Sequence, residues 1–169
     1  LGNHDDRQLR QLREHAAGTE PRFKHDNQRQ TFNKLAAVAA PLLVWLEQRA
    51  LYIEDEGFVL VHAGIHPEKG LSGTTRDEFL TIRTWPPADG IDGRRWHDVI
   101  APMQDRTLVF GHDAPGGLVM RRTEEHLPPW LLGLDSGCIY GGSLSAWIME
   151  EQRLVQTNSR QADGSRWWH

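Results

Sequence analysis

Three histidines, His4, His62 and His112, lie beside or just after an apolar run and have a glycine within two residues. A strand can present a polar side chain at its carboxyl end, and a neighbouring glycine lets the backbone or a ligand approach closely. One such histidine is more often a surface or hydrogen-bonded core residue. Three of them together with Asn3 favour a metal site, because imidazole nitrogens and amide oxygens suit zinc, manganese or iron.

Four glycine-containing motifs follow one another along the chain: Gly2–Asp5, Val61–Gly64, Phe110–His112, and Leu134–Cys138 with Tyr140–Gly142. In order and residue type they resemble the motifs of the calcineurin-like metallophosphoesterase superfamily. The resemblance is strongest to the branch that holds the serine/threonine protein phosphatases and the symmetrical diadenosine-tetraphosphatases. It covers about residues 1–156 and implies an α/β fold, a layered sandwich in which helices flank β-sheets.

The resemblance also implies a role for each residue of the first three motifs. Asn3 would ligate one metal ion through its side-chain oxygen, and His62 and His112 would ligate the same ion through ring nitrogens. His4 would instead protonate the leaving oxygen, a task for which a pKa near ~6.5 is suited. The implied cofactors are two divalent ions of manganese, iron or zinc. Held about 3.5–4 Å apart, they would activate a hydroxide for attack on phosphorus and stabilise the developing charge.

Three further residues have supporting roles in this interpretation. Arg83 lies where this branch places an arginine that binds phosphate, and guanidinium matches phosphate geometry; the alternative is an exposed loop arginine. Asp5 is expected to brace the turn that carries His4. Asp135 is expected to orient a ligand histidine, and a plain turn-forming role is an equal alternative.

The family pattern contains two aspartate motifs, Asp-x-His and Gly-Asp-x-x-Asp-Arg, ahead of Gly-Asn-His. They supply the ligands of the other ion and the carboxylate that bridges both. The chain starts with Leu1 rather than methionine, and neither motif occurs in it. We therefore expect an N-terminal truncation that removes the first β-α-β part of the fold. We also expect the chain alone to be inactive or nearly so, and the complete parent to be an enzyme.

The main functional prediction is hydrolysis of phosphate esters or anhydrides, with a serine/threonine-phosphatase-like hydrolase as the first choice. A symmetrical dinucleoside-tetraphosphatase or a polyphosphatase is the alternative, so the expected partner is a phosphorylated protein, a nucleotide or a polyphosphate. A non-catalytic module that keeps the fold is the alternative outside enzymes. Asp113 follows His112 where the family commonly has threonine. We expect its charge, near the mouth of the pocket, to disfavour a heavily charged polyphosphate.

Composition narrows the class of protein further. The net charge of -4 and the lack of a long basic run argue against nucleic-acid binding. No apolar stretch reaches 18 residues, so no membrane span is expected. The single cysteine, Cys138, excludes an internal disulfide and favours a reducing, cytoplasmic location. Cys138 itself is expected to be a small buried residue rather than a nucleophile.

Hydrophobic periodicity divides the chain into a helical first part and a second part rich in strands. Helices are expected over 6–17, over 30–49 with a break or kink at Pro41, and over about 76–82, with a loop over 20–29. A hairpin is expected over 51–61, its second run buried on both faces, and further strands over 107–110, 117–120, 130–134, 144–149 and 153–156. The phosphoesterase domain is expected to span 1–156, followed by a polar tail over 157–169.

The remaining histidines and two of the tryptophans are expected to have structural roles. His66 is expected to be exposed in a loop before Pro67, and lining the pocket is its alternative. The other five are expected at the surface: His15, His25, His97, His126 and His169. The segment Trp85–Pro87 and Trp96 are expected to pack under a loop, with an aromatic wall beside the pocket as the alternative.

Overall fold

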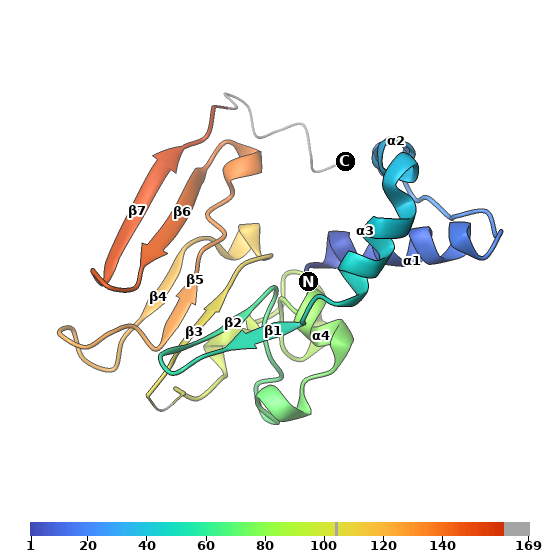
Figure 1. The fold of residues 1–169 in the computed structure, drawn as a ribbon. Coiled ribbons are helices and arrows are strands. Elements are labelled where there is room, and N and C mark those ends of the chain that lie inside the picture. The colour runs from blue at the N-terminus through green and yellow to red at the C-terminus, as the bar shows by residue number, and fades with distance from the viewer. Residues whose placement is uncertain (104, 161–169) are drawn as a thin grey trace. The chain divides into compact units, whose positions relative to one another are not determined.

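The computed structural model describes residues 1–103 and 105–160. They form two compact units, the first ending at Leu51 and the second beginning at Tyr52. The first unit is helical (Figure 1). Its elements are α1 (Asn3–Ala16), α2 (Asp26–Leu35), a 3-10 turn (Ala36–Val38) and α3 (Ala39–Glu47). Its core consists of Leu9 and Leu12 of α1, Phe32 of α2 and Leu46 of α3.

Helix α1 begins three residues earlier than the sequence predicts. Asp5 and Asp6 lie in its first turn, where negative charge favours the positive end of the helix dipole. Gly18, with φ 74°, follows the helix in the left-handed conformation that glycine adopts without strain. Because the helix starts at Asn3, both Asn3 and His4 belong to its first turn.

The second helical stretch is interrupted, as predicted, but not at Pro41. The break is the 3-10 turn at 36–38, and Pro41 occupies the first turn of α3. A proline is tolerated there because the first backbone N–H groups of a helix have no partner within it. The loop predicted over 20–29 is wrong at its end, since α2 already begins at Asp26.

The second unit contains a five-stranded mixed sheet and a separate two-stranded sheet (Figure 1). The large sheet has the order β1-β2-β3-β5-β4. Its strands are β1 (Tyr52–Glu54), β2 (Phe58–Val61), β3 (Thr107–Phe110), β4 (Val119–Arg121) and β5 (Leu131–Gly133). Strands β2, β3 and β5 are parallel, and the edge strands β1 and β4 are antiparallel to their neighbours. The predicted α/β class is confirmed.

The predicted hairpin forms, but β2 is not buried on both faces. Val59 and Val61 are buried, whereas Leu60 between them is 39% exposed. This alternation is the pattern of a strand with one open face. The neighbouring β5 fits the fully buried description instead, because all three of its residues are buried.

Helix α4 (Arg76–Thr81) lies in the long segment between β2 and β3 and matches its prediction closely. Thr75 caps it: the Thr75 hydroxyl accepts a hydrogen bond from the Glu78 N–H, and the Glu78 carboxylate accepts one from the Thr75 N–H. Phe79 of α4 packs on Tyr52 of β1, with ring centroids 5.3 Å apart. The segment is thereby fixed against the sheet.

The smaller sheet pairs β6 (Ser143–Ile148) with β7 (Arg153–Asn158) in antiparallel register. Strand β7 continues past residue 156, and the Ser159 N–H donates to the Gly142 carbonyl. The domain limits of 1–156 stay a prediction. The rest of the predicted tail, residues 161–169, lies outside the described residues.

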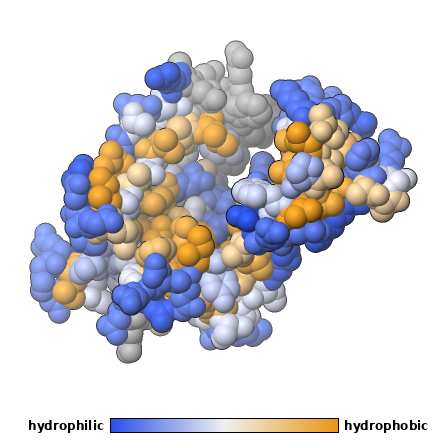
Figure 2. Space-filling view, in the orientation of Figure 1, coloured by the Kyte–Doolittle hydropathy of each residue, from blue (hydrophilic) through white to orange (hydrophobic). Residues whose placement is uncertain are grey.

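Hydrophobic residues are also gathered on the surface of the helical unit, over α3 (Figure 2). Val44 and Trp45 of α3, and Val38 at the end of the preceding 3-10 turn, are each more than half exposed. Within residues 1–103 and 105–160, no helix combines the length and apolar character needed to cross a membrane.

Candidate active site

Three candidate side chains follow three neighbouring parallel strands. His62 comes after β2, Gly111 and His112 after β3, and Asp135 after β5. The Gly111 N–H donates to the His62 carbonyl at 2.9 Å, which extends the β2–β3 pairing by one step beyond the strands. Because the carboxyl ends of parallel strands meet at one edge of a sheet, the fold brings His62 and His112 together, as the strand-end pattern implies.

The two imidazoles face each other through nitrogen atoms. His62 Nε2 and His112 Nδ1 are 3.1 Å apart, and the ring centroids are 4.9 Å apart at an interplanar angle of 57°. Two nitrogens that each lie about 2.1 Å from one ion are separated by roughly 3.0–3.4 Å at ordinary coordination angles. The observed separation therefore fits two ligands of one divalent ion.

His112 adopts a backbone conformation that is unusual for a residue with a side chain. Its φ is 68°, and the Asp113 N–H donates to the Gly111 carbonyl at 2.8 Å across a three-residue turn with His112 at its centre. Such turns are rare and strained, and strained residues concentrate at functional sites. In this backbone conformation the His112 ring faces His62.

Arg83 reaches this cluster from the segment after α4. Its Nη2 donates to the His112 carbonyl at 3.3 Å, and its Nε lies 3.8 Å from Asp113 Oδ1. Arg95 approaches the same carboxylate, with Nε 3.2 Å from Asp113 Oδ2. An arginine predicted to bind phosphate thus lies beside a predicted metal ligand, although 29 residues separate them in sequence.

Asp113 does not lie at the mouth of a pocket, as its sequence position suggested. Its side chain is only 2% exposed and faces the guanidinium groups of Arg83 and Arg95. Burial raises the pKa of the Asp113 carboxyl, while Arg95 and then Arg83 act to lower it. Its charge is therefore directed at two arginines rather than at a substrate, and the expected repulsion of polyphosphate loses its basis.

Asp135 forms a turn. Its Oδ1 accepts a hydrogen bond from the Gly137 N–H at 3.1 Å, the local bonding that aspartate commonly makes to the backbone two residues on. This matches the turn-forming alternative. Its role in orienting a ligand histidine stays a prediction.

The other three predicted residues belong to the helical unit. Asn3, His4 and Asp5 form the start of α1, and Asp5 Oδ2 accepts a hydrogen bond from the Gly2 N–H at 3.1 Å. Partial desolvation lowers the pKa of the exposed His4 ring, the Arg7 guanidinium lowers it further, and Asp5 acts to raise it. The hydrogen bond from the Gly2 N–H stabilises the turn, as predicted for Asp5. The roles of Asn3 as a metal ligand and of His4 as a proton donor stay predictions.

The predicted site residues are thus divided between the two units. The strand-bearing unit brings His62, His112 and Arg83 together, and the helical unit holds Asn3, His4 and Asp5 on one helical turn. In the part of the chain that the structure describes, no group of three or more His, Cys, Asp or Glu side chains is spaced to hold a metal ion.

His66 was expected to be exposed, but it is buried, with 4% of its surface accessible. Its Nδ1 accepts hydrogen bonds from the N–H groups of Glu68 and Lys69, and its ring packs on Trp85 with centroids 4.4 Å apart. Nδ1 is thus the acceptor of two backbone hydrogen bonds within the turn that follows His66. The turn residues that follow His66 are the sequence signal that could have indicated this bonding.

His97 was expected at the surface and is also buried. It is 4% exposed and packs between Trp96 and Phe110, at centroid distances of 5.8 and 5.3 Å. Arg121 donates to its backbone carbonyl at 2.7 Å. No sequence signal separates it from an exposed histidine, because its burial depends on strands β3 and β4.

We expect His97 to make the protein less stable in acid. Burial is the main cause that lowers its pKa; Asp98 raises the pKa, and Arg121 and Arg95 lower it further. Below about pH 6.5 the unfolded chain therefore binds a proton that the folded chain lacks, so stability is lost as pH falls from 6.5 toward the folded-state pKa. In denaturant titrations at about pH 7.5 and pH 5, His97→Asn should lose less stability than the parent.

The exposed His126, which lies 3.6 Å from Glu124, provides the control. His126→Asn should keep the pH dependence of the parent. An equal loss of stability for His97→Asn and the parent on acidification would contradict the role assigned to His97.

Comparison with known proteins agrees with the motifs. No protein-family model matches the chain. It is 28% identical to the symmetrical bis(5'-nucleosyl)-tetraphosphatase of Aromatoleum aromaticum, over 98% of the chain and 77% of that protein. It is 26% identical to the enzyme of the same name from Vibrio cholerae, over 90% of the chain and 73% of that protein. With the Bordetella pertussis enzyme the identity is 39% over 67 residues, which is 22% of that protein.

A solved structure gives the same result for the fold. A crystal structure of a proposed diadenosine tetraphosphatase matches with a TM-score of 0.63 and 27% sequence identity, over 94% of this chain and 67% of that chain. These similarities are consistent with a metal-dependent phosphoesterase of mixed α/β fold. The relatives of the chain are symmetrical bis(5'-nucleosyl)-tetraphosphatases, consistent with the resemblance to calcineurin-like metallophosphoesterases.

Proposed function

We propose that the chain is part of a metal-dependent hydrolase that cleaves the phosphoanhydride chain of a dinucleoside tetraphosphate. The observation that carries the proposal is the pair of imidazole nitrogens, 3.1 Å apart, at the carboxyl ends of β2 and β3. The names of the relatives supply the substrate class. They favour the tetraphosphatase alternative over a serine/threonine protein phosphatase.

His62, His112 and the side-chain oxygen of Asn3 would hold one of two divalent ions, of manganese, iron or zinc. When bound, such ions would supply Lewis-acid chemistry, which activates water for attack on phosphorus and neutralises phosphate charge. Arg83, held beside His112 by its bond to the His112 carbonyl, binds a non-bridging phosphate oxygen. The Asp113 carboxylate, 3.8 Å from Arg83 Nε, attracts the same guanidinium by its charge.

His4 donates the proton that the leaving phosphate oxygen requires. The lowered pKa of its ring leaves less of the protonated form at neutral pH. The negative charge of a bound phosphate opposes this effect because it favours the protonated imidazole. Asp5 braces His4 through the Gly2 N–H, and Asp135 keeps the turn after β5 in place. The cytoplasmic location suggested by the single cysteine remains part of this proposal.

A substrate profile tests the function. The complete gene product, loaded with manganese, should hydrolyse diadenosine tetraphosphate to two molecules of the nucleoside diphosphate, since symmetrical cleavage divides the chain in the middle. It should have a kcat/KM at least about 10-fold lower for a phosphoserine peptide and for inorganic polyphosphate, which is a difference of about 1.4 kcal/mol in transition-state binding. A higher kcat/KM for the phosphopeptide would reject the proposal.

A further inference from the structure

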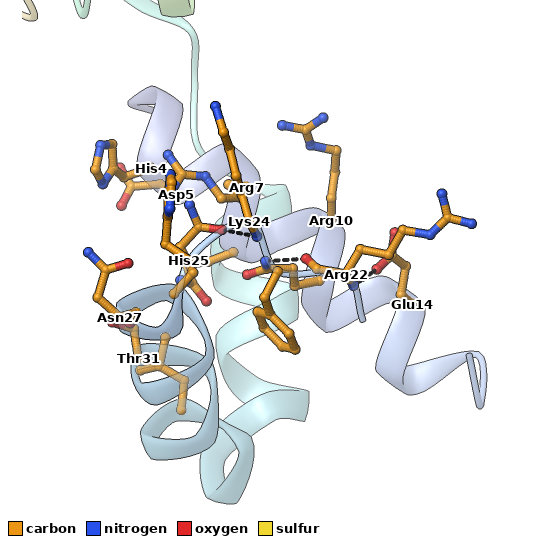
Figure 3. Close-up of a pocket in the computed structure, with 15 residues that line it drawn as sticks. His4, Asp5, Arg7, Arg10, Glu14, Arg22, Lys24, His25, Asn27 and Thr31 are labelled. Atoms are coloured by element: carbon orange, nitrogen blue, oxygen red, sulfur yellow. Dashed lines mark hydrogen bonds between the residues drawn. The ribbon is translucent and has the colours of Figure 1, made fainter. Parts of the chain in front are cut away.

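A groove of about 990 Å³ lies entirely within the helical unit, between α1, the loop that follows it and α2 (Figure 3). His4, the proposed proton donor, lies at one end of it. Arg7, Arg10, Arg22 and Lys24 also line it. In the view of Figure 3, the Arg7 and Lys24 side chains extend to the same side of the groove as His4.

The charge of the groove is unbalanced. Its two acidic residues are each bound to a backbone N–H: Asp5 accepts from Gly2, and Glu14 accepts from Arg22 at 3.2 Å. Within the described residues, neither Arg7 nor Lys24 forms an ion pair, although Arg10 lies 3.4 Å from Asp6. Two cations that come from different segments and have no acidic partner form a site suited to an anion.

One residue that lines the groove contains a buried hydrogen-bond acceptor. Gln11 is 3% exposed, and its Nε2 donates to the Arg22 carbonyl at 2.8 Å. Its Oε1 has no hydrogen-bond partner among the described residues. A buried carbonyl oxygen without a donor costs free energy, and a nucleoside supplies hydroxyl and amine donors.

We propose that this groove binds the unreacted part of the nucleotide substrate. Arg7 and Lys24 contact the phosphate groups that lie beyond the leaving phosphate, to which His4 donates a proton. The inference rests on the proposed function and adds the binding surface to it. The phosphate chain supplies several negative oxygens in a row. Arg7 and Lys24 hold these oxygens in the groove through their positive charge.

The test measures binding separately from hydrolysis. The full chain is titrated calorimetrically in EDTA with inorganic tripolyphosphate, with diadenosine tetraphosphate and with adenosine. Arg7→Gln and Lys24→Gln should each weaken binding of both phosphate compounds by about 10-fold, and the double variant by about 100-fold, as expected for charge-assisted contacts. Added salt should weaken the parent more than the double variant.

Lys34→Gln is the matched control, since Lys34 is an exposed residue of α2 that does not line the groove. It should bind both compounds like the parent. Adenosine should bind weakly to all variants alike, and tighter binding of diadenosine tetraphosphate than of tripolyphosphate would show that the nucleoside is also held.

Two outcomes would overturn the inference: a double variant that binds as tightly as the parent, or a Lys34→Gln variant that weakens binding as much as Arg7→Gln does. Hydrolysis is not needed for this readout. If diadenosine tetraphosphate is not the preferred substrate but substitution of Arg7 and Lys24 still weakens binding, the proposed function is rejected and the binding role of the groove is retained. If hydrolysis is found but substitution of Arg7 and Lys24 does not change binding, only the proposed role of the groove is rejected.

Discussion

Replacing either His62 or His112 with alanine should abolish tight binding of a divalent metal ion. The two ring nitrogens are already 3.1 Å apart, and the strained turn at His112 holds one of them in place. Each variant therefore removes one preformed ligand and leaves the other in position. Because even residues that only orient a ligand change metal affinity by about 10–100-fold, loss of a ligand should exceed that range.

The first measurement is a manganese titration of the full chain, followed by calorimetry or by the shift of its melting temperature. A ligand that binds only the folded state raises its stability, so the parent should show a metal-dependent shift that both variants lose. His126→Ala, at an exposed position of the same unit, should keep the shift. Equal manganese affinity in the parent and the His112→Ala variant would rule out the histidine pair as a metal site.

The second measurement is turnover by the complete gene product. A metal centre contributes several kcal/mol to transition-state stabilisation, so kcat/KM for diadenosine tetraphosphate should fall by at least about 10³-fold in each variant. The double variant should be no worse than either single variant, because the two ligands act through one ion. Losses that multiply in the double variant would show that the two residues act independently.

The part of this site that was predictable is the part encoded locally. A buried strand is visible as an apolar run, and its end is visible as a glycine next to a polar residue. His62 and His112 both satisfy this pattern, and the structure places them at adjacent strand ends. The α/β class follows from the same local signals, and so do most element positions.

Features that depend on residues distant in sequence were not predictable in this way. The ring of His66 is covered by Trp85, and that of His97 by Phe110. The buried position of Asp113 depends on Arg83 and Arg95, which come from a long segment without regular periodicity. Hydrophobic periodicity carries no information on such contacts, because it reports only which face of one element is apolar.

The basic groove of the helical unit illustrates the same limit for binding sites. Arg7 belongs to α1, whereas Arg22 and Lys24 belong to the loop before α2, where the sequence indicated only a polar connection. The chain has a net charge of -4, so its composition gives no sign of a basic surface. A local cluster of cations can exist in an acidic protein because the field of a charge falls off within about 8–10 Å at ordinary ionic strength.

A second large effect is expected from Gly64→Ala, which should strongly destabilise the strand-bearing unit. A Cβ on Gly64 would lie 2.4 Å from Trp96 Cε2 and 2.7 Å from both Cζ2 and Nε1. The indole cannot move away easily, because it is 0% exposed and packs edge-on against Phe110 at 5.0 Å. Overpacking of this kind costs typically about 1–3 kcal/mol, and a contact this short favours the upper end.

Urea unfolding of the full chain measures this cost, with Gly57→Ala as the control. No atom lies within 4 Å of the position that a Cβ would take on Gly57, so that variant should stay within about 0.5 kcal/mol of the parent. Because Gly64 is two residues after His62, the same Gly64→Ala variant should also weaken manganese binding. Normal stability of Gly64→Ala would mean that the Trp96 ring is free to shift.

A double-mutant cycle identifies Trp96 as the cause. In Trp96→Phe the part of the indole that meets the new methyl group is removed, and Trp96 Nε1 makes no hydrogen bond among the described residues that would be lost. Gly64→Ala should therefore cost about 1–2 kcal/mol less in the Trp96→Phe background than in the parent, a coupling of the size found for residues in direct contact. If the cost is the same in both backgrounds, the damage arises in the backbone after His62, and the glycine is required there for the turn rather than for the approach of Trp96.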